Sequence, residues 1–234
     1  MTVYRPLLKI CGVANPLDAK LVAQSGADFC GILVGVSFSE RNLSLDQAVD
    51  VAAAARAAMD RIHIVALLCD SSLDRALEVQ KRIRPHALQL LCHESPQFLA
   101  DLKSRVPCQV WKTIHLPLEP ARPGPDAYVQ AGADALLVDS IDQSEGFTRM
   151  GGTGKVADWD AVGELIETIK TPVFLAGGIG PENVAQALVR IRPFGIDLCS
   201  GVEASKGRKD AHKLEMLINN FSAAQAALNE ENKK

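Results

Sequence analysis

Two residues of this sequence could exchange protons with a bound molecule, and each ends a short, largely apolar run. Asp139 follows residues 135–138, and Cys11 follows residues 7–10. A carboxyl group at the end of a buried strand is partly desolvated, which raises its pKa and lets it donate a proton near neutral pH. A thiol becomes a useful base only where a cation or a helix terminus lowers its pKa. The simpler alternatives are that Asp139 caps a turn and that Cys11 fills space in the core.

Two glycine-containing turns could hold an anion. They are Ala176-Gly177-Gly178-Ile179 and Ser200-Gly201-Val202-Glu203, and each follows an apolar run. Glycines let backbone N–H groups approach a phosphate closely, and the start of a short helix adds a favourable dipole. Plain turn glycines are the alternative, but two such turns favour a phosphate site. The sequence has no Walker motif, so we do not expect a nucleoside triphosphate.

The elements that must position these residues alternate regularly. Short apolar runs predict eight strands, at residues 7–11, 29–34, 62–69, 87–91, 109–114, 135–139, 173–176 and 196–200. Helical patterns follow each strand, at residues 16–25, 44–59, 73–83, 95–104, 125–131, 160–169, 181–191 and 210–228. A helix between consecutive strands returns the chain to the same end, so the strands are predicted to be parallel.

Eight such units in 234 residues predict a single-domain (β/α)8 TIM barrel. We expect the barrel to span residues 1–228 and a polar C-terminal tail to span residues 229–234. An open doubly wound sheet is the alternative, but no Gly-x-Gly-x-x-Gly follows the first strand. In a barrel, the carboxyl-terminal strand ends line the active site, which would bring Cys11 and Asp139 to opposite sides of one mouth. The glycine turns follow strands seven and eight, where this fold commonly binds phosphate.

Two further groups near the predicted mouth have open roles. Arg41 lies in the loop after the second strand and could bind a carboxylate, or it could be a surface charge paired with Glu40. Four possible metal ligands also fall near the mouth, but their spacing matches no ligand motif, so we expect no metal. These four are Cys69, Cys92, His93 and His115.

Composition narrows the class of protein. Apolar residues make up 47% of the chain, and the formal net charge is -3, which gives no basic surface for nucleic acid. No apolar run approaches the length of about 20 residues that a membrane helix needs, and the first residues lack the apolar region of a signal peptide. We therefore expect a cytoplasmic protein, monomer or homodimer. Its six cysteines are expected to be reduced, with Cys30, Cys108 and Cys199 as core filler.

In order and in combination, several segments resemble the phosphoribosylanthranilate isomerase family of tryptophan biosynthesis, whose members are single-domain (β/α)8 barrels. The resemblance runs from about residue 8 to residue 220 and is most specific in the last third. The segments are Lys9-Ile10-Cys11-Gly12, Arg41, Leu88-Gln89-Leu90, Glu94-Ser95-Pro96, Asp139-Ser140, Gly151-Gly152-Thr153-Gly154-Lys155, Asp158-Trp159, Leu175-Ala176-Gly177-Gly178, Pro181-Glu182-Asn183-Val184, Ser200-Gly201-Val202-Glu203 and Lys209-Asp210.

The resemblance implies an Amadori rearrangement of a phosphorylated sugar, without metal or cofactor. By position, Asp139 would be the general acid that opens the ribose ring, and Cys11 the general base at the sugar C2. Arg41 would bind the anthranilate carboxylate. The turns with Gly177, Gly178, Ser200 and Gly201 would bind the phosphate, and the loop with Gly151, Gly152 and Gly154 would close over the substrate.

The sequence departs from the family pattern in three loops. Leu91-Cys92-His93 replaces the usual His-Gly-acidic run, and Ser37-Phe38-Ser39-Glu40-Arg41 lacks the usual prolines. The third, residues 140–150, is longer than usual. All three would lie around the anthranilate side of the pocket.

Two other functions remain open from the sequence. One is a related barrel that acts on another phosphorylated sugar, as an isomerase, an epimerase with metal ligands, or an aldolase with Lys112 as its Schiff-base residue. The other is a non-catalytic member that binds a metabolite.

Overall fold

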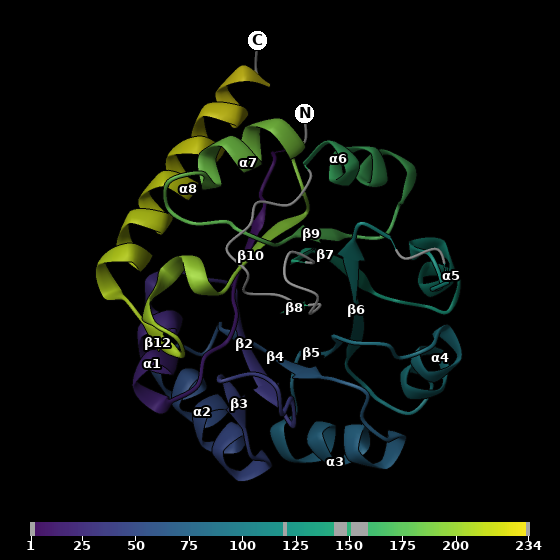
Figure 1. The fold of residues 1–234 in the computed structure, drawn as a ribbon. Coiled ribbons are helices and arrows are strands. Elements are labelled where there is room, and N and C mark those ends of the chain that lie inside the picture. The colour runs from purple at the N-terminus through teal and green to yellow at the C-terminus, as the bar shows by residue number, and fades with distance from the viewer. Residues whose placement is uncertain (1–2, 119–120, 143–148, 151–158, 233–234) are drawn as a thin grey trace.

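Eight parallel strands form a closed barrel surrounded by helices (Figure 1). The computed structural model describes residues 3–118, 121–142, 149–150 and 159–232, and only the backbone of residues 140–142 and 149–150. The barrel closes because β1 pairs with both β10 and β2. The barrel strands are β1 (Leu7–Ile10), β2 (Phe29–Val34), β4 (His63–Leu68), β5 (Ala87–Leu90), β6 (Gln109–Leu116), β7 (Ala135–Asp142), β9 (Val173–Leu175) and β10 (Gly195–Leu198). The predicted fold class is confirmed.

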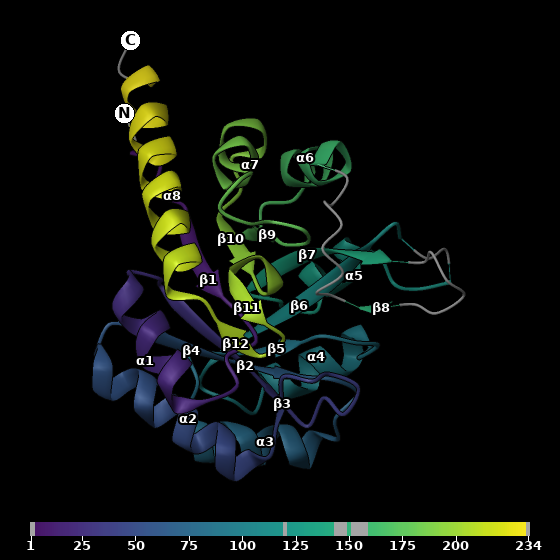
Figure 2. The ribbon, with the colours of Figure 1, turned by 60° about the vertical axis from the view of Figure 1, so that its left-hand side comes forward.

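The helices pack on the outside of the barrel, and Figure 2 shows the longest, α8, running along its flank. Local signals begin most of them: side chains of Asn15, Ser44, Ser72, Ser95 and Asp210 accept hydrogen bonds from backbone N–H groups of the first turns. They are α1 (Pro16–Ser25), α2 (Leu45–Ala58), α3 (Leu73–Ile83), α4 (Pro96–Lys103), α5 (Pro125–Gln130), α6 (Trp159–Thr168), α7 (Val184–Ile191) and α8 (Ala211–Glu231). Of the helices in the described ranges, none combines the length and apolar character required to cross a bilayer.

The core has two layers. One lies between strands and helices, and the other fills the barrel interior. Aromatic rings fill the interior toward the strand starts: Trp111 stacks on Phe174 with ring centroids 4.9 Å apart, and Phe29 meets Trp111 edge-on at 5.2 Å. Because this end is filled, open space in the barrel is left at the carboxyl-terminal ends of the strands, where a ligand can enter.

Short strands that we did not predict from the sequence lie around the mouth of the barrel. They are β3 (Asn42–Leu43), β8 (Arg149–Met150), β11 (Glu203–Ser205) and β12 (Arg208–Lys209), with the 3-10 turn η1 (Ser200–Val202). Two or three residues carry too little periodicity to reveal a strand. The β11–β12 hairpin matters for the site, because it carries Glu203 and Lys209 to the mouth.

The last helix continues past the boundary expected from the sequence. α8 ends at Glu231, so residues 229–231 of the predicted tail are helical. The reason is a side-chain clamp: Asn229 Oδ1 accepts a hydrogen bond from Tyr4 N at 2.8 Å, and Asn229 Nδ2 donates to Tyr4 O at 2.9 Å. This clamp ties the N-terminal segment of the chain to its last helix. The polarity of residues 229–234 could not reveal it, because the contact joins residues far apart in the sequence.

We predict that Gly195→Ala destabilises the barrel. A Cβ at residue 195 would lie 2.5 Å from Phe174 Cδ1 and 2.8 Å from Leu7 O, inside the packed interior. Overpacking of this kind costs about 1–3 kcal/mol, which urea unfolding would measure. Gly163→Ala in α6 is the matched control, since the nearest atom to a Cβ there is Ile191 Cδ1 at 4.0 Å, an ordinary contact. Equal stability of the two variants would contradict the prediction.

Candidate active site

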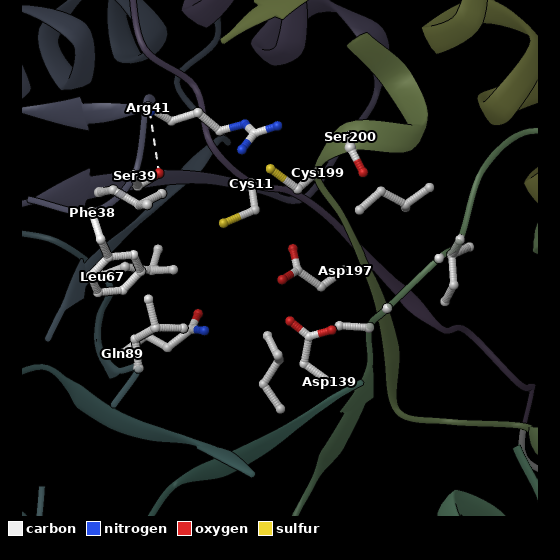
Figure 3. Close-up of a pocket in the computed structure, with 18 residues that line it drawn as sticks. Cys11, Phe38, Ser39, Arg41, Leu67, Gln89, Asp139, Asp197, Cys199 and Ser200 are labelled. Carbon is white, nitrogen blue, oxygen red and sulfur yellow. Dashed lines mark hydrogen bonds between the residues drawn. The ribbon is translucent and has the colours of Figure 1, made fainter. Parts of the chain in front are cut away.

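One pocket of about 720 Å³, its open mouth included, lies at the carboxyl-terminal ends of the strands. Cys11 and Asp139 both line it, and Figure 3 shows their side chains directed into the same space from different strands. They are 6% and 8% exposed, so each is largely removed from bulk water yet reachable from the pocket. The sequence-based expectation that these two residues share one cavity is confirmed by this placement.

Cys11 fits in this place because its neighbour on β2 has no side chain. A Cβ on Gly31 would lie 2.9 Å from Cys11 Sγ and 3.1 Å from Cys11 Cα. The pKa of this thiol is not lowered, as a general base would need. Burial raises the pKa of Cys11 to about 12, although the charges of Lys9 and Lys209 act in the opposite direction. With this pKa, Cys11 is a protonated thiol near neutral pH.

A buried ion pair lies beside Cys11. Lys9 Nζ, fully buried on β1, donates to Asp197 Oδ2 on β10 at 2.9 Å, and the two residues are direct partners in the strand register. Burial acts to lower the pKa of Lys9, but Asp197 outweighs it and the pKa is raised, so Lys9 stays charged. Burial also raises the pKa of Asp197, against the opposing charge of Lys9.

One carboxylate oxygen of Asp197 is available to accept a hydrogen bond from a ligand. Its Oδ1 is buried and, among the described residues, has no hydrogen-bond partner. The residue lines the pocket, and its carboxylate faces the same space as Asp139 (Figure 3). A buried acceptor without a partner costs free energy unless something fills its place. A ligand hydroxyl in the pocket would satisfy it.

Arg41 is half-buried and bound within the chain. Its Nε and Nη2 donate to Glu203 Oε1 and Oε2 at 2.8 and 2.6 Å, a two-pronged ion pair. Glu203 also accepts from Lys209 Nζ at 3.0 Å. Burial works against ionisation of Glu203, but the hydrogen bonds from Arg41 hold its pKa below the usual range. The alternative pairing with Glu40 is wrong, because Glu40 pairs with Lys206 instead.

The two glycine turns meet at one end of the pocket. Gly177 and Gly178 have φ values of 87° and 64°, a left-handed conformation that favours glycine at two successive positions. A Cβ on Gly201 would overlap Ile179 O and lie 2.9 Å from Gly180 Cα, so the second turn packs directly against the first. Gly177, Gly178 and Ser200 line the pocket, whereas Gly201 does not and packs instead against Ile179 and Gly180.

The opposite end of the pocket is mostly apolar. Leu33, Phe38, Leu67 and Leu91 line it, with Phe38 and Leu67 on the side of the pocket away from Ser200 (Figure 3). Gln89 is the polar exception; its Nε2 donates to Thr113 Oγ1 at 2.9 Å, which directs the amide. The pocket thus offers small backbone-exposing turns at one end and an apolar wall at the other.

Two cysteines at the mouth are joined, which corrects the expectation of six reduced thiols. Cys69 and Cys92 form a disulfide between the ends of β4 and β5, whereas Cys11, Cys30, Cys108 and Cys199 are free. The expectation was wrong because the two cysteines are 23 positions apart in the sequence, whereas the fold brings their Cα atoms to 4.9 Å. In the described part of the chain, one set of possible metal ligands lies close together, Cys69, Asp70 and Cys92. Its sulfurs are bonded to each other.

The predicted set of site residues and the observed pocket lining differ in several places. Gly151, Gly152 and Gly154 lie outside the described residues. Cys199, expected as core filler, lines the pocket instead. The sequence reasoning missed Asp197 as a pocket residue and gave no role to Lys9. The available signal was a charged residue inside each apolar run, two positions before Cys11 or Cys199, since residues i and i+2 face the same way in a strand.

The fold and the pocket define a (β/α)8-barrel enzyme whose acid, thiol and glycine turns surround one mouth. Residues 8–220 match the family model of N-(5'phosphoribosyl)anthranilate (PRA) isomerase. The chain is 38% identical over 212 residues to N-(5'-phosphoribosyl)anthranilate isomerase of Natronomonas pharaonis, covering 90% of this chain and 95% of that protein. A Methanocella arvoryzae relative of the same name is 38% identical over 216 residues, with 90% and 95% coverage.

Solved structures agree. The phosphoribosyl anthranilate isomerase of Thermus thermophilus is 30% identical with a TM-score of 0.76, covering 93% of this chain and 98% of that one. That of Thermotoga maritima is 26% identical with a TM-score of 0.76, at 94% and 100% coverage. The chain belongs to the N-(5'-phosphoribosyl)anthranilate isomerase family, and so to the intramolecular isomerases of tryptophan biosynthesis. The family resemblance read from the motifs is confirmed.

We predict that His115 makes stability depend on pH. Its Nε2 lies 2.9 Å from Leu91 O at the mouth, and burial lowers the pKa of His115 to about 4. The unfolded chain, with an ordinary histidine pKa near 6.5, binds more protons between these values. The free energy of unfolding therefore falls as pH decreases from about 6.5 to about 4, by about 2 kcal/mol from this residue.

Urea unfolding at pH 7 and pH 4.5 would measure this loss in the wild type and in His115→Gln. The glutamine variant should lose less stability on acidification, because its side chain takes up no proton. An equal loss in both proteins would contradict the prediction.

Proposed function

We propose that Asp139 and Cys11 carry out the Amadori rearrangement of N-(5'-phosphoribosyl)anthranilate as general acid and general base. The observation that carries this proposal is their placement in one pocket with the two glycine turns at its end. The substrate is then bound with its phosphate at Gly177, Gly178, Ser200 and Gly201. The anthranilate ring occupies the apolar end, against Phe38, Leu67 and Leu91.

The reaction needs two proton transfers on opposite sides of the sugar. Asp139 gives its proton to the ribose ring oxygen, the bond from that oxygen to C1 breaks, and the nitrogen lone pair forms the Schiff base. The Cys11 thiolate takes the proton from C2, and the electrons of that C–H bond form the C1–C2 double bond of an enolamine. Tautomerisation, with a proton returned to C1, gives the 1-deoxyribulose 5-phosphate product.

The base must lose its own proton before this step. Burial favours the thiol form of Cys11, and the charges of Lys9 and Lys209 favour its thiolate. The bound substrate would exclude water from the pocket, and so would the loop bearing Gly151, Gly152 and Gly154 when it closes. With water excluded, the attraction of both lysine charges for the thiolate becomes stronger. Lys9 is thus a positioning and electrostatic residue for the base.

Arg41 is proposed to bind the anthranilate carboxylate with the donors that Glu203 leaves unused. Glu203 occupies Nε and one N–H of Nη2, so Nη1 and the second Nη2 hydrogen remain for a ligand. The ion pair also fixes the direction of the guanidinium before substrate arrives. Such preorganisation lowers the entropy lost on binding.

The structure weakens the aldolase alternative. Lys112, the one lysine considered for a Schiff base, is 2% exposed and does not line the pocket. Its Nζ donates to Leu90 O, Cys92 O and Glu94 Oε2 at 3.2, 2.6 and 3.2 Å. A lysine held by three acceptors behind the wall has no path to a sugar carbonyl.

Location and assembly stay predictions. We propose a cytoplasmic enzyme, monomer or homodimer, whose partner is its phosphorylated sugar substrate and which binds neither nucleic acid nor membrane. The Thermotoga maritima relative is described as a dimer from which monomers were generated. Gel filtration with light scattering would decide the assembly of this chain.

We predict that Cys11→Ala and Asp139→Asn each lower kcat by about 10²–10⁴-fold, the usual contribution of a general acid or base. The measurement is the loss of anthranilate-type fluorescence as phosphoribosylanthranilate is consumed. Cys30→Ala is the matched control, because Cys30 is buried in the strand–helix layer away from the pocket and should leave kcat unchanged. Binding of a phosphate-bearing ligand should persist in both active-site variants. Full activity of either would overturn the proposed roles.

We predict that Asp197→Asn lowers kcat/KM about tenfold or more, because Asp197 Oδ1 is proposed to accept a hydrogen bond from a ribose hydroxyl. Removing only the negative charge leaves Lys9 buried and unpaired, which could also affect folding. The double variant Lys9→Met/Asp197→Leu removes both charges and should keep the fold while losing the activity. A double variant with wild-type kcat/KM would contradict the prediction.

A further inference from the structure

The bonded cysteines lie next to the wall that would receive the aromatic ring. Cys69 follows the last residue of β4, and Cys92 comes two residues after the end of β5. Their near neighbours Leu67 and Leu91 line the apolar end of the pocket. Both sulfurs pack on the barrel-interior cluster. The disulfide therefore adds a covalent link between the two strand ends that hold this wall, which the backbone hydrogen bond from Leu91 N to Leu68 O at 2.8 Å also joins.

The two sulfurs differ in access and in electrostatic surroundings. Cys92 is 3% exposed, whereas Cys69 is only partly buried and precedes the exposed Asp70. An attacking thiolate can therefore reach Cys69 and not Cys92. Asp70 Oδ2 lies 3.8 Å from Cys69 Sγ and disfavours a negative charge there. On the other side, Lys112 Nζ donates to the backbone oxygen of Cys92 at 2.6 Å and to Glu94 Oε2 at 3.2 Å, so a cation lies near Cys92.

A second set of contacts holds the same loops independently of the bond. Glu94 Oε1 accepts from Asp70 N at 2.8 Å, and Glu94 Oε2 accepts from Cys92 N at 3.1 Å. Asp70 Oδ1 accepts from His93 N at 2.8 Å. These hydrogen bonds span the two loops, so opening the disulfide leaves both strand ends in the fold. The bond can open as a local event.

We propose that Cys69–Cys92 is a reversible thiol–disulfide exchange site for a dithiol reductant, and that its state sets the affinity of the apolar end of the pocket. A thiolate of the dithiol bonds to the Cys69 sulfur, and the Cys69–Cys92 bond breaks with its electron pair on Cys92. The second thiol of the reductant then displaces Cys69. Two electrons and two protons pass to the protein cysteines, and the dithiol becomes a disulfide.

The chemistry of the compartment and of the remaining thiols agrees with this assignment. A disulfide in a reducing compartment is usually transient or redox-sensing, so the predicted cytoplasmic location favours exchange over a permanent link. Cys11 does not compete for the bond, because burial keeps it a thiol and a poor nucleophile. The disulfide adds a covalent constraint to the hydrogen bonds that hold the segments of Leu67 and Leu91, and reduction removes that constraint from the wall.

The exchange itself is tested on the full chain without any activity measurement. The protein is equilibrated with mixtures of reduced and oxidised dithiothreitol in the presence of EDTA, which removes metal from the freed thiols. It is then denatured in acid, alkylated and weighed by mass spectrometry. Four alkylated cysteines are expected in the oxidised form and six in the reduced form. Six at every ratio, including without reductant, would overturn the exchange site.

The effect on affinity rests on the proposed function and is measured separately. Reduction should raise KM for phosphoribosylanthranilate, and the Kd of free anthranilate, roughly threefold to tenfold, with kcat changed less than about twofold. Cys69→Ser/Cys92→Ser should show the reduced values under all conditions. Cys108→Ser, at the far end of β6, is the matched control and should respond like the wild type.

The measurements of labelling, anthranilate binding and turnover distinguish failure of the redox proposal from failure of the proposed function. Equal anthranilate Kd values in the two redox states would overturn control of the pocket by the disulfide. Absence of turnover in both states, with labelling and Kd behaving as expected, would count against the proposed catalytic function and leave the exchange site supported.

Discussion

The Lys9–Asp197 ion pair is the interaction on which the site depends most. It joins β1 to β10, where the last strand closes the barrel onto the first, and it lies fully inside the protein. A buried pair of this kind contributes little net stability, because desolvation offsets the attraction, but loss of one partner is costly. In the proposed mechanism the pair has two roles beside Cys11: the charge of Lys9 favours the thiolate, and Asp197 Oδ1 accepts a hydrogen bond from the substrate.

A second network extends this arrangement to the mouth. Arg41 comes from the loop after β2, whereas Glu203 and Lys209 both belong to the β11–β12 hairpin, and the ion pairs among them tie these two segments together. Gly12 is part of the same arrangement, since a Cβ there would lie 2.6 Å from Cys199 Sγ and strike the Arg41 side chain. The cations are thus held before a substrate arrives, and electrostatic preorganisation of this kind is a large part of catalysis in a water-excluded site.

The two ends of the pocket are built on different principles. Backbone geometry makes the end with the glycine turns, where Gly177 and Gly178 adopt left-handed conformations and Gly201 packs against the neighbouring turn. Side chains and a disulfide make the apolar end, which coincides with the loops that depart from the family pattern. Backbone geometry changes little with solution conditions. A wall held by a sulfur–sulfur bond responds to the redox state around it.

The sequence by itself determined the barrel, because alternating runs and helix caps such as Asn15 and Ser44 act over a few residues. It also determined the placement of Cys11, Asp139 and the glycine turns, since parallel strands bring their carboxyl-terminal ends to one mouth. Only the tertiary structure decided which partners these residues meet: Arg41 with Glu203, Lys9 with Asp197, Cys69 with Cys92 and Tyr4 with Asn229. Each pair joins segments that are separated in the chain. Such contacts depend on how the elements pack, which a pattern of neighbouring residues cannot predict. The rise in the pKa of Cys11 has the same origin, because burial is a property of the whole fold.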